Sequence, residues 1–290
     1  MTAPLENWYT LSIIALLFIG TQRFLYKVSA QRGCNTAITT YTFMGTVTCI
    51  SFILLLFSNT PLNHIPFLVF ISLVNSISFT SATLAHMETL KYLPVNVAYP
   101  IIRLNVAVVV IFSVLFFRDP LSAWQIAGIF VAICAILTLA KSPDTRETGD
   151  KNIRRGFVLL SVCVLSGAVA SISSKFAAME VGKLAFITLS YLFGTAFAFG
   201  LRNRMVQKTT DGGNRDAVII GIGMGLLNLI GFYLFLLALD RGPLSIVVSI
   251  ISLHFVIPIV LSALFYAEKL KKAHFIGIGL TIVSVLFLRM

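Results

Sequence analysis

One stretch of this sequence occurs twice, 149 residues apart. The matching pairs keep one register, and they are Pro94 with Pro243, Leu104 with Leu253, Ser113 with Ser262, Phe116 with Phe265, Asp119 with Glu268, Leu121 with Leu270 and Gly128 with Gly277. The offset also holds upstream, where Ile38-Thr39 falls on Ile187-Thr188. So many matches in one register indicate two homologous halves.

The composition excludes a soluble globular protein. Of 290 residues, 58% are hydrophobic and only 11% are charged, so one soluble core could not bury the apolar surface. Ten apolar runs have about the 20 residues that a membrane helix needs: 9–26, 36–57, 65–92, 95–117, 122–140, 155–174, 183–201, 216–239, 244–266 and 272–288. The sequence therefore predicts an all-α integral membrane protein with ten transmembrane helices.

A polar stretch from Lys141 to Arg155 separates the two halves. We predict a first five-helix repeat over residues 1–140, a linker over 141–154 and a second five-helix repeat over 155–290. Because each repeat has an odd number of helices, the second repeat enters the membrane from the opposite side. The halves should thus be two inverted repeats, an architecture typical of secondary transporters.

The net charge of +11 is interpreted as an orientation signal rather than as nucleic-acid binding. Sixteen Lys and Arg residues lie on the side of loops 1–2, 3–4, 5–6, 7–8 and 9–10, and five lie on the side of both termini. The positive-inside rule then places both termini outside the cytoplasm. The flank of the first run has Glu6 and no Lys or Arg, so we expect this run to be retained in a multi-pass protein of the cell (plasma or inner) membrane.

Arg103 is the strongest single indication of function, because it lies inside the fourth apolar run. An arginine at that depth costs about 3 kcal/mol unless it faces a cavity or a partner. It is therefore a candidate for binding substrate or for coupling; the alternative is a structural salt bridge with Glu88. If it binds an anion, its bidentate fork should matter as well as its charge.

The second repeat places Ser252 and His254 opposite Arg103 and Asn105 at the same offset. Pro100 and Pro258 each free a helix carbonyl nearby, which is tolerated in a membrane where it lines a cavity. We expect a water-accessible pocket with Arg103, Asn75, Tyr99, Asn105, Ser252 and His254 at or near its wall. His254 could instead be bonded to a neighbouring helix.

The third run carries polar residues at helical spacing, among them Asn75 and His86, which indicates a face turned away from lipid. This face either packs against another helix or borders a solvated path. Lys175 is a weaker substrate candidate, because it could simply reach the interface. Asp119 and Glu268 are interpreted as caps of the helices that follow them.

The sequence has no enzyme constellation, no nucleotide-binding loop, no metal-ligand spacing among its four cysteines and no evident sodium cage. We therefore predict no cofactor, no metal and no catalytic residue. Protons or substrate exchange remain as the energy source. The candidate proton carriers are His254, Glu88 and His86.

Three motifs carry a family resemblance: Ala238-Leu-Asp-Arg-Gly-Pro243, Leu264-Phe-Tyr-Ala-Glu268 and the weaker Leu115-Phe-Phe-Arg-Asp119. With the repeat, they make the chain similar to EamA-type members of the drug/metabolite transporter superfamily. The resemblance implies five plus five inverted helices, a central cavity bounded by helices 3, 4, 8 and 9, and alternating access. It also implies cytoplasmic termini, opposite to the charge count; a reporter fusion at the C-terminus distinguishes the two.

The leading hypothesis is a secondary active transporter, an exporter or exchanger, of a small anionic or zwitterionic metabolite such as an amino acid. A flippase for lipid-linked sugars or phospholipids is the alternative within transport. A non-transporting scaffold or receptor is the alternative from another class, and its interior should be packed with its polar groups paired. The expected partners are a small-molecule substrate, protons and membrane lipid, in a monomer or homodimer.

Overall fold

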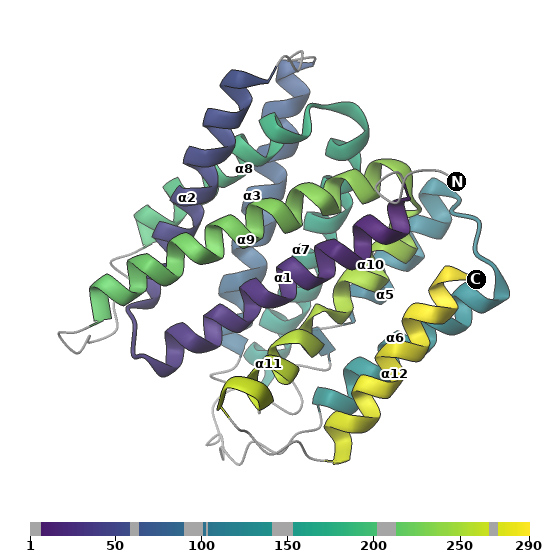
Figure 1. The fold of residues 1–290 in the computed structure, drawn as a ribbon. Coiled ribbons are helices and arrows are strands. Elements are labelled where there is room, and N and C mark those ends of the chain that lie inside the picture. Colours follow the sequence, from purple (N-terminus) through teal and green to yellow (C-terminus); the bar gives the residue numbers. More distant parts are fainter. Residues whose placement is uncertain are drawn as a thin grey trace.

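The structure is a computed structural model that describes residues 7–58, 64–89, 101–102, 104–140, 153–201, 213–266 and 272–290 (Figure 1). The described part is helical throughout. Its main elements are α1 (Trp8–Gln31), α2 (Thr36–Phe57), α3 (Ile65–Thr89), α5 (Asn105–Phe112) continued by the π-helix η2 (Ser113–Phe117), α6 (Ala123–Ala140), α7 (Ile153–Glu180), α8 (Lys183–Leu201), α9 (Gly213–Arg241), α10 (Leu244–Ser252), the 3₁₀ turn η4 (Leu253–Phe255), α11 (Val256–Tyr266) and α12 (Lys272–Arg289).

Seven of the described helices are long and apolar enough to cross a membrane. Three shorter apolar helices, 105–117, 123–138 and 273–289, occupy the remaining predicted runs. The outer surface is apolar, with Phe57 86% and Leu115 75% exposed, as expected of side chains that face lipid. An all-helical, multi-pass membrane fold is confirmed, whereas the count of ten membrane helices stays a prediction.

Helix ends follow local side-chain chemistry. The Asn7 side chain accepts the Tyr9 N–H at the start of α1 (3.0 Å), and Gly33 ends this helix with a positive φ of 63°. At the start of α6, Ser122 and Gln125 exchange backbone and side-chain hydrogen bonds in a capping box.

Asp119 does not cap the helix that follows it, contrary to the sequence-based interpretation. Ser122 caps α6 instead, and the Asp119 carboxylate accepts hydrogen bonds from the Ser245 N–H (3.0 Å) and hydroxyl (2.8 Å) at the start of α10. The Ser113 hydroxyl also donates to Asp119. The first repeat thus caps a helix of the second, where an acid favourably meets the positive end of the dipole. Glu268 lies outside the described residues.

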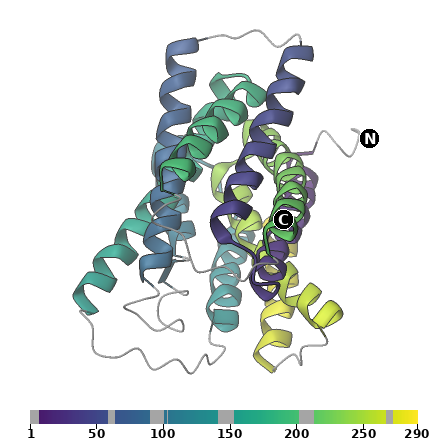
Figure 2. The same ribbon diagram turned by 90° about the vertical axis from the view of Figure 1, so that its left-hand side faces the viewer.

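The most extensive helix contacts all join one repeat to the other. α1 packs on α9 and α3 on α7, while α2 packs on α8 and α9, and α6 pairs with α12. Figure 1 shows α1 lying along α9, and α6 beside α12; in the turned view of Figure 2, α7 leans against α3. The first helix of each repeat thus packs on the third helix of the other repeat. A pseudo-two-fold axis produces this reciprocal pairing.

The fourth helix of each repeat is interrupted at the same position. The Leu104 N–H donates to the Ile101 carbonyl (3.0 Å), three residues back, and α5 starts afterwards. At the equivalent place in the second repeat, Leu253 donates to the Ile250 carbonyl and begins η4. Tight turns of this kind inside a helix often mark a functional hinge or site.

Glycines set how closely helices approach these interruptions. A Cβ built on Gly20 of α1 would lie 2.5 Å from the Ile257 Cγ1 and 2.9 Å from the His254 carbonyl oxygen. A Cβ on Gly225 of α9 would lie 2.7 Å from the Thr46 Cβ. Gly225 therefore allows α9 to pack closely on α2.

Candidate functional site

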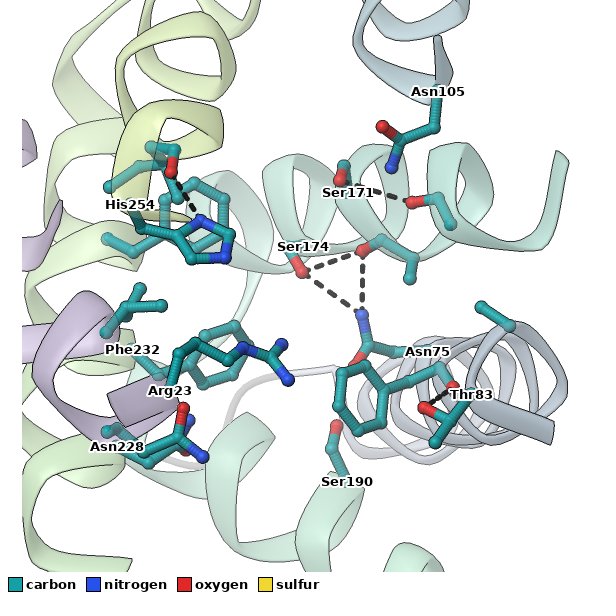
Figure 3. A pocket seen from close by; sticks show the side chains of 18 of the residues that line it. Arg23, Asn75, Thr83, Asn105, Ser171, Ser174, Ser190, Asn228, Phe232 and His254 are labelled. Atoms are coloured by element: carbon teal, nitrogen blue, oxygen red, sulfur yellow. Dashed lines mark hydrogen bonds between the residues drawn. The ribbon is translucent and has the colours of Figure 1, made fainter. Parts of the chain in front are cut away.

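A cavity of about 340 Å³ lies between the two repeats, beside both helix interruptions. It is lined by residues of α1, α2, α3, α5, α7, α8, α9 and α10 and by His254 of η4. Its polar lining comprises Gln22, Arg23, Tyr26, Asn75, Ser76, Thr83, Asn105, Ser171, Ser174, Ser190, Tyr191, Asn228, Ser252 and His254. Figure 3 shows several of these side chains directed into one space from different helices.

Four of the predicted site residues meet at this cavity: Asn75, Asn105, Ser252 and His254. Tyr99 and Arg103 lie outside the described residues. His86 and Glu88 belong to α3, but their side chains also lie outside the described part. The described residues therefore bring together the predicted residues of both repeats, and the role of Arg103 stays a prediction.

The Asn75 side chain joins α3 to α7 through hydrogen bonds. Its Nδ2 donates to the Ala170 carbonyl (2.8 Å) and contacts the hydroxyls of Ser173 (2.9 Å) and Ser174 (3.1 Å). The polar face predicted for α3 is thus turned inward, where it packs against α7 and also borders the cavity. The two roles that the sequence left open occur side by side.

His254 lies in the 3₁₀ turn and is 9% exposed. Its Nδ1 is 2.7 Å from the Ile251 carbonyl oxygen. A carbonyl oxygen can only accept, so Nδ1 carries the proton and the ring orientation is fixed by its own helix. Asn105, on the equivalent position of the first repeat, faces Gly167, where an added Cβ would be 3.0 Å from the Asn105 Nδ2.

Lys175 does not line the cavity. Its ammonium group is buried, donates to the carbonyls of Leu239 and of Gly242 (3.0 Å), and lies 5.9 Å from the Phe117 ring. A cation at the last carbonyls of α9 is favoured by the helix dipole. Lys175 and the Asp119–Ser245 contact thus both lie at the connection between α9 and α10.

Sequence reasoning did not predict most of the polar lining, including Arg23, Tyr191 and Asn228. Arg23 was counted only among the charges that set orientation, although it lies inside the first apolar run and inside α1, which continues to Gln31. A polar residue in a strongly apolar helix was the available signal for Asn228; Tyr191 had none.

Several buried polar atoms at the cavity have no hydrogen-bond partner in the described part of the chain. They are the Oε1 of Gln22 and the hydroxyls of Ser76 and Ser190. Buried polar groups are normally satisfied, by protein or by water. Such atoms beside a cavity are consistent with a space that takes up water or a polar ligand. No group of three or more metal-ligating side chains occurs within the described ranges.

Comparison with known proteins agrees with this architecture. The chain is similar to a solved structure titled only as a crystal structure of a protein, with a TM-score of 0.77, 14% sequence identity, and coverage of 97% of this chain and 95% of that one. At this identity, the likeness shows the fold alone. The chain matches no curated protein sequence. The sequence model of the EamA-like transporter family matches residues 6–140 and again 154–290, so this chain belongs to the EamA-like transporter family, a family of multi-pass membrane transporters.

Proposed function

We propose that this protein is a secondary active transporter that moves a small anionic or zwitterionic metabolite, such as an amino acid, across the cell membrane. The observation that carries the proposal is the cavity between the repeats, whose wall holds unpaired buried polar atoms. A scaffold would have a packed interior with its polar groups paired. The cavity therefore favours transport over the scaffold reading.

The charge of the cavity supports an anionic or zwitterionic substrate. Arg23 is a permanent cation, and no Asp or Glu occurs among the described lining residues. A volume of about 340 Å³ fits a metabolite of amino-acid size. The substrate would meet residues of both repeats at once.

We expect the transport cycle to use the two interrupted helices and the contacts at the α9–α10 connection. The Lys175 and Asp119 contacts join parts of both repeats at the α9–α10 connection. Alternating access would require these contacts to open as the repeats rock about the cavity. The tight turns at Leu104 and at η4 (Leu253–Phe255) are the points where we expect the fourth helices to bend.

Transport itself is tested in proteoliposomes. Vesicles with purified protein and an internal mixture of amino acids and small carboxylates should take up at least one labelled compound from an external panel of the same compounds. Protein-free vesicles give the background. Uptake no faster than this background for every compound, with and without a proton gradient, would contradict the proposal.

His254→Gln should abolish proton-driven accumulation and spare exchange of substrate against substrate. Histidine can change its charge near neutral pH, and His254 sits at the interrupted helix beside the cavity. The measurement compares uptake driven by a proton gradient with counterflow, and Glu88→Gln is tested alongside. If both variants accumulate substrate as well as the wild type does, neither residue is an essential proton carrier.

A further inference from the structure

The register between α1 and α9 places Arg23 beside Asn228. A Cβ on Gly231 of α9 would lie 2.9 Å from the Ile19 Cγ1, and a Cβ on Gly223 would lie 3.6 Å from the Leu25 Cδ1. The two helices therefore run antiparallel. One turn forward from Ile19 on α1 and one turn back from Gly231 on α9 lead to Arg23 and Asn228, at the same level.

Arg23 has no hydrogen bond or ion pair with any residue that the structure describes. Its guanidinium lies over the Tyr26 ring, 5.4 Å from the ring centre. Figure 3 shows this group reaching into the middle of the cavity, with Asn228 and His254 on different sides. A guanidinium that is exposed to a cavity and unpaired offers its fork of N–H groups to a carboxylate.

Asn228 supplies a second donor whose orientation is fixed. The Tyr191 hydroxyl donates to the Asn228 Oδ1. The Tyr191 ring packs edge-on against Phe43 and Phe232, with ring centres 5.9 and 6.0 Å away. Because the Asn228 oxygen accepts from Tyr191, the orientation of the amide is set and its NH₂ group is available to donate.

We infer that Arg23 and Asn228 form a carboxylate subsite within the cavity, with Tyr191 as the positioning residue for Asn228. The inference rests on the proposed function, and it assigns the substrate's anionic group to α1 and α9. Arg23 supplies the bidentate, charged contact, and Asn228 supplies a neutral N–H to the same carboxylate.

The subsite is tested by thermal stabilisation of the purified full-length protein in detergent. Three probe pairs, each a carboxylate and its amide, are titrated: benzoate and benzamide, L-leucine and L-leucinamide, succinate and succinamide. At least one carboxylate should stabilise the wild type when its amide does not. Arg23→Gln should bind that carboxylate roughly 10- to 100-fold more weakly, and Asn228→Leu roughly 3- to 10-fold more weakly.

The matched control is Arg32→Gln, which removes the same charge from a surface pair with Asp216 (3.1 Å) and should leave affinity unchanged. Arg23→Gln should change the melting temperature of the unliganded protein little, because within the described residues Arg23 has no hydrogen bond or ion pair and loses only its contact with the Tyr26 ring. Arg103→Gln is titrated in parallel. The inference is overturned if no carboxylate binds, if Arg23→Gln keeps wild-type affinity, or if only Arg103→Gln loses it.

The same variants separate this inference from the proposed function. Carboxylate binding that depends on Arg23, without uptake of any compound into vesicles, would leave the subsite standing and remove the transport proposal. Normal uptake of a carboxylate by Arg23→Gln would support the transport proposal and remove the subsite.

Discussion

Lys175→Met should lower stability by about 2 to 4 kcal/mol, because it leaves the Leu239 and Gly242 carbonyls buried without their donor. Met keeps much of the length and apolar volume of the lysine stem, so the change removes the charge with little loss of packing. For a chain of this size, the apparent melting temperature in detergent should fall by roughly 5 to 12 °C. The shift is measured by the loss of the monodisperse peak after heating.

The control for this variant is Lys183→Met, close by in the chain. Lys183 pairs with Asp240 at 2.9 Å, but the two side chains are 19% and 36% exposed. An ion pair that water reaches contributes about 0 to 1 kcal/mol. Equal effects of the two substitutions on the melting temperature would show that the burial of Lys175 adds nothing to its contribution to stability.

Gly20→Val should lower the free energy of unfolding by about 3 kcal/mol, because even a Cβ at this position overlaps Ile257 and the His254 carbonyl. To accommodate it, α1 must move away from the interrupted helix or the interruption must shift. We expect a low yield of monodisperse protein, and a lower melting temperature in what remains.

Gly279→Val is the matched control, because a Cβ on Gly279 has nothing within 4 Å. This variant should purify and melt like the wild type. A Gly20→Val protein as stable as Gly279→Val would mean that the close approach of α1 to η4 is not needed for the fold.

The sequence predicted some helices closely and others poorly, for one physical reason. α2 (36–57) and α8 (183–201) match their predicted bounds. α1 and α7 continue past the predicted ends at 26 and 174 to Gln31 and Glu180. Hydropathy places a boundary at the first charged residue, but a charge can continue a helix inward where a cavity or carbonyl oxygens receive it.

The site was predictable where the repeat pointed to it and where the polar face of the third run pointed to Asn75. The offset of 149 residues linked Asn105 with His254, and both line the cavity. Asp119 could not be assigned in this way, because its partner Ser245 is 126 residues away and in the other repeat. Arg23 and Asn228 meet only through the register of α1 on α9, which glycine packing sets and hydropathy does not encode.

The exchange of helices between the repeats has a consequence for biogenesis. α1 and α3 enter the membrane early in synthesis, yet their main partners, α9 and α7, belong to the second half of the chain. Until α7 is made, Asn75 has none of its partners Ala170, Ser173 and Ser174 and must face lipid or the insertion machinery. The first repeat therefore cannot complete its packing until the second repeat has been made. A chain truncated before α9 should be degraded by membrane proteases rather than accumulate as a folded half.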